Sequence, residues 1–297
     1  MTKTSDIAAG WARTFMVSPR GFTNQLSRCG HYEFEDTICD LENAHLIAPA
    51  HNRTSRLAGK IRNRLSDYTP WYGCVPTGTR AVLPQASYEL GFFLIQFAWD
   101  IINFDTIRDW RRRAQITVCV IEELWAADIP RFRHKLNVLK DFDLIFCCCA
   151  ASVDALAEHL DRPVHYLPPA VDAIRFAPHR GGRPRVIDVF SMGRRSPVTH
   201  EALVELARRE GLYYYHDTLV RPFFAREPAQ HRLVLASTVK HSRYFIANLA
   251  KAIGCTRQSG NRKWGSAFSK AWPAVPFSSA IHRGRPSSTS CSTGRTR

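Results

Sequence analysis

Residues 162–196, RPVHYLPPAVDAIRFAPHRGGRPRVIDVFSMGRRS, constrain the fold of this chain more than any other segment. Residues 164–167 have the apolar pattern of a short buried strand, and the two prolines that follow cannot donate to a sheet ladder. Residues 179–184 contain no apolar side chain, which is typical of a connection between domains. Residues 186–190 predict another strand, followed by a helix that begins at Pro197. The segment therefore predicts two α/β units joined by a hinge.

The rest of the chain alternates between strand-like and helix-like segments. Residues 116–121, ITVCVI, form a β-branched run typical of a strand that is buried on both faces. Residues 18–36 are interpreted as a loop that precedes a helix over residues 37–43. Ser152 is placed to cap a helix that ends at Leu160. This alternation predicts a parallel sheet with crossover helices.

The net charge of +15 comes mainly from the C-terminal part of the chain. Residues 228–297 hold 12 of the 41 Lys and Arg and none of the 26 Asp and Glu, where about eight acids are expected at ordinary usage. The 29 basic and 26 acidic side chains of the first 227 residues are close to balanced. A hydrophobic content of 45% indicates a globular protein. Residues 52–66 carry five of the basic side chains and predict a helix with a solvated face.

Three features favour a cytoplasmic protein without a membrane segment. The N-terminal residues lack the apolar core of a secretory signal. The longest apolar run, residues 90–104, is interrupted by polar residues and is too short to cross a bilayer. The nine cysteines show no paired spacing, which is typical of reduced thiols.

Two motifs resemble glycosyltransferases of the two-Rossmann-domain (GT-B) type. PPAVDAIRFAP at residues 168–178 resembles the P-x-G-V-D-x-x-x-F-x-P segment with which these enzymes cross between domains, with Ala170 in place of the usual glycine. VIDVFSMGRRSPVTHEAL at residues 186–203 is similar to the strand, phosphate loop and helix that begin their donor-binding half. The similarity extends over roughly residues 14–251 and is strongest over residues 142–248. It implies two Rossmann-like domains, the second truncated, and transfer of a sugar from a nucleotide-sugar donor to an unknown acceptor.

The predicted donor loop consists of Gly193, Arg194, Arg195 and Ser196. A glycine at a strand end lets the backbone approach a ligand, and the free N–H groups of the following helix can bind an anion. Two guanidinium groups suit a diphosphate, which gains charge as the bond to the sugar breaks. The resemblance implies this role for the loop, without an obligatory metal or other cofactor. An ordinary strand-to-helix turn with solvated arginines is the alternative.

The predicted acceptor side lies at the end of the strand over residues 116–121. Glu122 and Glu123 follow this strand, and ligands of open α/β sheets bind beyond the carboxyl ends of the strands. Either acid could contact an acceptor hydroxyl or act as a base, or serve only the first turn of a helix. Arg20 and Gly21 lie past the first strand and, with His31 as a candidate base, are expected to face the same cleft.

Cys147, Cys148 and Cys149 invite a metal hypothesis that strand geometry disfavours. Neighbouring strand residues point to opposite faces, so three in a row cannot converge on one ion. Apolar packing is the favoured interpretation. The twelve histidines show no ligand spacing backed by acids, and no metal site is predicted.

The acid-free tail is interpreted as a displaced reading frame. The resembled enzymes continue with a segment of the type E-V-G-F-R-F-F-E-G-L-A-G-G-A-V, where this chain has RKWGSAFSKAWPAVPFS. When the codons are read one frame over, every junction across this segment permits the family residue. We hypothesise a frameshift between about residues 250 and 261. The alternatives are a genuine disordered tail, or a basic arm of a non-catalytic protein that binds nucleic acid or acidic surfaces through interleaved aromatic residues.

The sequence thus predicts three regions: an acceptor-side domain over residues 1–170, a partial nucleotide-sugar-binding domain over residues 171–254, and a low-complexity basic tail over residues 255–297. If the tail is genuine, the two donor-site carboxylates of the family are missing and the enzyme is expected to be inactive or impaired. An incomplete second sheet would also leave apolar surface exposed.

Overall fold

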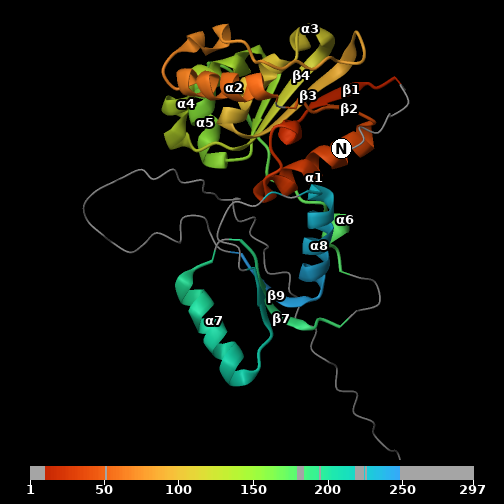
Figure 1. The fold of residues 1–297 in the computed structure, drawn as a ribbon, viewed down its shortest axis with the longest axis vertical. Helices are drawn as coiled ribbons and strands as arrows, with labels where there is room; N and C mark the ends of the chain where they lie inside the picture. The colour runs from red at the N-terminus through yellow and green to blue at the C-terminus, as the bar shows by residue number, and fades with distance from the viewer. Residues whose placement is uncertain are drawn as a thin grey trace, which may run out of the picture.

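The structure is a computed structural model, which describes residues 11–50, 52–178, 184–193, 195–217, 224 and 226–247. It contains a six-stranded and a three-stranded β-sheet in which every strand pairing is parallel, with helices packed against both. This confirms the predicted α/β class. The two sheets lie in separate lobes of the molecule (Figure 1).

The first lobe holds the six-stranded sheet. Its helices and strands are, in chain order, β1 (Thr14–Val17), α1 (Cys29–Glu42), β2 (His45–Ile47), α2 (Arg53–Ser66), β3 (Tyr88–Phe97), α3 (Trp110–Arg113), β4 (Ala114–Glu123), α4 (Ile129–Leu136), β5 (Leu144–Cys147), α5 (Val153–Leu160) and β6 (His165–Tyr166). A long 3-10 helix, Ala98–Thr106, follows β3.

The second lobe holds the three-stranded sheet and follows a short helix, α6 (Ala173–Phe176). Its elements are β7 (Ile187–Ser191), α7 (Pro197–Glu210), β8 (Tyr214–His216), α8 (Pro228–Lys240) and β9 (Ser242–Ile246). β6 and β7 belong to different sheets, as two α/β units require. Most of the predicted connection at residues 179–184 lies outside the described residues, as does the tail.

The two sheets share one winding order. The first has the order β2-β1-β3-β4-β5-β6 and the second has the order β8-β7-β9. In each sheet the first strand lies between the second and the third, so the chain turns to opposite sides of that strand. Ligands of open α/β sheets bind beyond the carboxyl ends of the strands at such a switch point. The loops that follow β1 and β7 therefore occupy equivalent positions in the two lobes.

The first sheet is covered on both faces. One face packs against α4, α5 and the 3-10 helix after β3, and Phe93, Trp110 and Phe142 lie at its centre. The other face, which includes Leu94 and Val120, packs against Phe34 of α1 and its neighbours. β4 is buried from Thr117 to Ile121, but Ile116 is half-exposed. The predicted burial on both faces is therefore correct for every residue of the 116–121 run except Ile116.

Helix α1 corrects the interpretation of residues 18–36 as a loop. It begins at Cys29 and ends where Asn43 adopts a left-handed conformation, with φ of 48°. Its buried positions include His31, Glu33 and Glu35, so the inward face of this helix is largely polar. An apolar stripe, which is the usual sequence signal of an amphipathic helix, is therefore missing.

Three smaller expectations also need correction. β6 is an edge strand whose residues, His165 and Tyr166, are exposed, so the predicted burial is wrong for them. Ser152 does not cap α5; its hydroxyl donates to the backbone carbonyl of Leu124 at 2.6 Å. The basic helix over residues 52–66 is present as α2, but Arg62 on it is buried and not solvated.

The lobes meet through α1. Helix α8 packs against α1, and α6 packs against α8 (Figure 1). Glu33 of α1 receives Arg175 of α6 at 2.6 Å and Arg232 of α8 at 2.5 Å. The loop after β1 also pairs with the segment before α8, through an antiparallel bridge between Gln25 and Phe224. These contacts connect the loops at the carboxyl ends of the two sheets.

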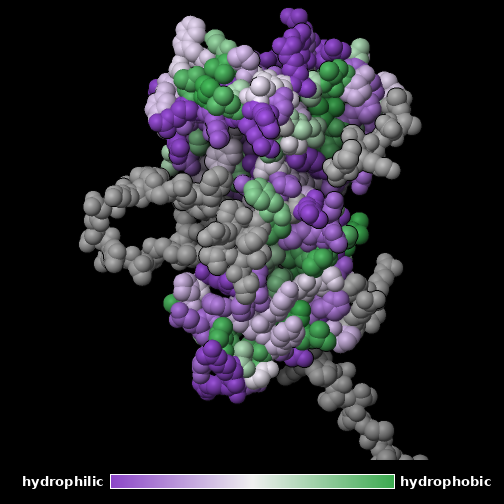
Figure 2. Space-filling model, in the orientation of Figure 1, coloured by the Kyte–Doolittle hydropathy of each residue, from purple (hydrophilic) through white to green (hydrophobic). Residues whose placement is uncertain are grey.

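Apolar side chains are exposed on the three-stranded sheet of the second lobe. Tyr244 and Phe245 of the edge strand β9 are 60% and 44% exposed. Figure 2 shows hydrophobic residues on the surface of both lobes among mostly hydrophilic ones. Within the described part of the chain, no helix combines the length and the apolar character needed to cross a membrane.

Candidate functional site

The structure brings two of the predicted acceptor-side residues into contact. Glu122 and Glu123 are the last residues of β4, and His31 lies on the third position of α1. Nδ1 of His31 lies 3.0 Å from Oε2 of Glu122. His31 is fully buried, whereas the Glu122 side chain remains 16% exposed. Glu123 instead accepts a hydrogen bond from Nε2 of Gln96 at 3.3 Å.

A second carboxylate lies on the other side of the imidazole. Nε2 of His31 is 3.1 Å from Oε1 of Glu35, one helical turn away on α1. Glu35 is itself fully buried, and its Oε2 receives the hydroxyl of Ser18 at 2.5 Å and Nη2 of Arg20 at 2.7 Å. We call Glu122, His31, Glu35 and Arg20 the buried relay. Within this relay Arg20 holds Glu35 in place, because its guanidinium pairs with Glu35 and Asp36.

Gly21 fixes the loop that carries Arg20. A Cβ atom at this position would lie 2.3 Å from the backbone oxygen of Pro49, in the loop after β2. Any other residue would push these two loops apart. Glycine is therefore required here for close backbone packing, which holds Arg20 in place.

The two carboxylates set the charge of His31. Burial alone would lower the pKa of the imidazole, but Glu122 and Glu35 outweigh it and raise the pKa to about 9. His31 is therefore protonated at neutral pH, and both of its nitrogens face carboxylates. A protonated imidazole cannot accept a proton, so the geometry does not support the predicted base role of His31. It suits a residue that holds the side chain of Glu122 in position.

This pKa predicts a pH-dependent stability. The pKa of His31 in the folded protein lies above the usual 6.5, so protonation of His31 stabilises the fold. This stabilisation is fully present below about pH 6.5 and is lost as the pH rises through about 9. The loss should be on the order of 3 kcal/mol in the free energy of unfolding. Urea unfolding across this pH range tests it, with His31→Gln as the comparison. The variant should lack this loss, and equal pH profiles for the two proteins would contradict the assignment.

A second buried ion pair lies beside the relay. Arg28, just before α1, makes two hydrogen bonds of 2.9 Å to the carboxylate of Asp100, in the 3-10 helix after β3. Both side chains are at least nine-tenths buried. Asp100 also accepts the backbone N–H of Phe97 at 3.0 Å. The pair joins the loops after β1 and β3, which flank the switch point of the first sheet.

The loop after β7 has the backbone geometry expected of a donor loop. Gly193 has φ of 78°, and no atom lies within 4 Å of the place where its Cβ would stand. Ser196 caps α7 by accepting the N–H of Thr199 at 3.4 Å. Nη1 of Arg195 contacts Nδ1 of His216 at 2.8 Å and the backbone oxygen of Asp217. Arg194 lies outside the described residues.

Asp217 at the end of β8 occupies the anion-facing side of this loop. Its Oδ2 accepts the N–H of Gly193 at 2.9 Å, and its Oδ1 lies 3.5 Å from Nη1 of Arg195. A carboxylate thus makes the contacts that a phosphate oxygen could make with the same groups. Asp217 was absent from the sequence prediction because the sequence gives no signal that β8 ends beside β7.

Two of the three consecutive cysteines lie in the apolar interior, where packing was expected. Cys147 and Cys148 are buried and Cys149 is half-buried, and each carries a free thiol. The described part of the chain contains no group of three or more His, Cys, Asp or Glu side chains that could hold a metal ion.

Sequence reasoning found Glu122 and His31 separately but missed what joins them. Glu35 could have been found, because His31 and Glu35 are four residues apart and share one helix face once the helix is assigned. Arg28 and Asp100 gave no such signal, because 72 residues separate them. No contact joins the relay to Arg195 among the described residues.

Comparisons with known proteins give little further information. No protein-family model and no curated protein matches the chain. A solved structure, described as an alpha-glucosyltransferase in complex with UDP and a 13-mer DNA containing a HMU base, is similar with a TM-score of 0.36 and 11% sequence identity. The match covers 68% of this chain and 54% of that chain, so this chain spans about half the length of that structure. A likeness this weak establishes neither family nor activity.

Proposed function

We propose that this protein is a glycosyltransferase that moves a sugar from a nucleotide-sugar donor to a hydroxyl acceptor. The donor diphosphate would bind the loop after β7, and the acceptor would lie beyond the carboxyl end of β4. The resemblance of residues 168–178 and 186–203 to GT-B enzymes supports this assignment. The proposal includes no obligatory metal, with arginines in the role of the counter-charge.

The observation that carries the proposal is the shared winding of the two sheets. Their loops after β1 and β7 lie at equivalent switch points, where α/β sheets bind ligands. Gln25 and Phe224 pair across the lobes, so segments from the carboxyl ends of both sheets are in contact. A donor held by one lobe and an acceptor held by the other could meet at such a junction.

The chemistry assigns a different task to each lobe. As the bond between sugar and diphosphate breaks, negative charge develops on the leaving diphosphate, and Arg195 with the N-terminus of α7 would stabilise it. The acceptor hydroxyl must lose a proton as it attacks. The side chain of Glu122 is partly exposed and is held by His31 at 3.0 Å, so it would accept that proton.

A panel of nucleotide sugars tests the proposal, with release of the nucleoside diphosphate as the readout. Because the frameshift hypothesis concerns donor-site carboxylates, the panel should be applied to this chain and to a frame-corrected chain. We expect donors to raise the melting temperature of both chains, with release faster from the corrected one. If no donor stabilises or is turned over by either chain, the proposal is wrong.

Glu122→Gln gives the residue-level test in the same assay. Loss of the base should lower the rate of transfer about 100-fold or more, with donor binding unchanged. Glu89→Gln is the matched control, because Glu89 pairs with Arg13 at the amino end of β3. Equal rates for the two variants would remove Glu122 from the proposed mechanism.

A further inference from the structure

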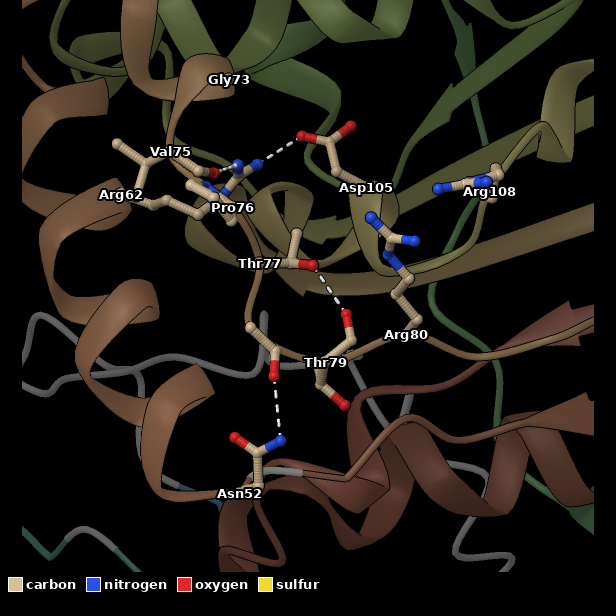
Figure 3. A pocket seen from close by; sticks show the side chains of 11 residues that line it. Asn52, Arg62, Gly73, Val75, Pro76, Thr77, Thr79, Arg80, Asp105 and Arg108 are labelled. Atoms are coloured by element: carbon tan, nitrogen blue, oxygen red, sulfur yellow. Dashed lines mark hydrogen bonds and ion pairs between the residues drawn. The ribbon is translucent and has the colours of Figure 1, made fainter.

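A cavity of about 700 Å³ lies in the first lobe, between α2, the loop over residues 73–80 and the segment after β3 (Figure 3). Its lining includes Arg62, Arg80 and Arg108 together with one acid, Asp105. None of the residues of the buried relay or of the predicted donor loop lines it. It is therefore a separate site.

The charges in this cavity are not balanced. Arg62 is 2% exposed and is paired with Asp105, and it also donates to the backbone oxygen of Val75. Asp105 is thus already paired with Arg62. The exposed guanidinium groups of Arg80 and Arg108 have no hydrogen-bond or ion-pair partner within the described part of the chain. Asp105 and Arg62 neutralise each other, so the lining carries two uncompensated positive charges, those of Arg80 and Arg108.

The two unpaired arginines stand on one side of the cavity, and Arg62 and Val75 stand on the other (Figure 3). Two like charges at one cavity repel each other unless an anion lies between them. Arg side chains match the oxygens of phosphate groups in both geometry and charge.

The wall of the cavity is firmly held. Gly78 has φ of 72°, and a Cβ there would lie 2.7 Å from the Cα of Ser55 on α2. Its backbone oxygen accepts a hydrogen bond of 2.9 Å from Nδ2 of Asn52, the residue that caps α2. The hydroxyl of Thr77 donates to the backbone oxygen of Thr79 at 2.6 Å. The loop is thus anchored to α2, and the cavity is preformed.

We propose that this cavity binds a phosphate-bearing small molecule through Arg80 and Arg108. Its volume lies in the range of cavities that enclose ligands of metabolite size. The phosphate or diphosphate group lies between the two guanidinium groups, and Arg62 with Asp105 forms the fixed floor of the site. This proposal does not depend on the glycosyltransferase assignment.

Calorimetric titration with pyrophosphate tests it. The full-length Arg195→Ala variant is the reference protein, because it weakens the contribution of the predicted donor loop to binding. Adding Arg80→Ala or Arg108→Ala should each weaken binding about tenfold or more. Adding Arg56→Ala removes an exposed charge of α2, the helix beside the cavity, at a residue that does not line it, and it should leave the affinity unchanged.

Chemical protection locates the bound anion independently. An arginine-specific dicarbonyl should modify Arg80 and Arg108 in the free protein, and pyrophosphate should slow their modification selectively over that of Arg56. The proposal is overturned if pyrophosphate does not bind the reference protein. It is equally overturned if the Arg56 variant loses as much affinity as the cavity variants, or if the three arginines are protected alike. None of these results bears on the donor loop.

Discussion

Replacing Asp100 by alanine should destabilise the protein by about 3–5 kcal/mol, because it leaves Arg28 buried without its partner. The carboxylate makes both 2.9 Å hydrogen bonds to this guanidinium and accepts the N–H of Phe97. Loss of these three hydrogen bonds leaves buried donors without acceptors. This destabilises the protein by more than the intact ion pair stabilises it. Urea unfolding measures the change.

Two comparisons separate the ion pair from general damage. Asp40→Ala removes an exposed acid of α1 and should change the stability by no more than about 0.5 kcal/mol. Adding Arg28→Met to Asp100→Ala removes the unpaired charge and should restore part of the loss. If the double variant is no more stable than Asp100→Ala, the cost does not come from an uncompensated arginine.

Replacing Glu33 by alanine should lower the free energy that holds the two lobes together by about 3 kcal/mol. Glu33 is 5% exposed and is the shared partner of Arg175 and Arg232, which come from the two helices on the far side of the contact. Its loss leaves two guanidinium groups close together without the carboxylate that they share, and only Arg175 keeps another carboxylate, Asp172 at 3.4 Å. Amide hydrogen exchange in α8 should accelerate, whereas exchange in β3 and β4 should not change.

Glu42→Ala is the matched control for Glu33, because Glu42 lies on the same helix and is exposed. It should leave exchange in α8 unchanged. Uniform acceleration across both lobes in the Glu33 variant would show that α1 supports global stability and not the interlobe contact in particular.

The sequence was sufficient for the architecture because parallel sheets leave a strong local signal. The β-branched run at residues 116–121 predicted β4, and Glu122 and Glu123 were correctly placed at its end. Pro197 predicted where α7 begins, and the structure adds Ser196 as the cap of this helix. Each of these inferences depended on neighbours within a few residues.

The contacts that define the candidate site left no local signal. Glu33 and Arg232 are 199 residues apart, and His31 and Glu122 are 91 residues apart. Helix α1 also could not be recognised from the sequence, because its inward face carries paired charged side chains and few apolar ones. A polar helix face can be buried only when distant partners satisfy it, so it becomes recognisable only after the fold is known.

The most direct test of the central claim is the affinity of the full chain for a nucleoside diphosphate, measured by calorimetry with Arg80→Ala present throughout to exclude the cavity. Each charge-assisted contact contributes enough that Arg195→Ala should weaken binding about 10- to 100-fold. Asp217→Asn, which removes the competing negative charge and keeps an acceptor for Gly193, should strengthen it. Arg243→Ala, at the amino end of β9 and paired with Asp188, should have no effect. Equal affinities in all four proteins, or no binding at all, would contradict the account.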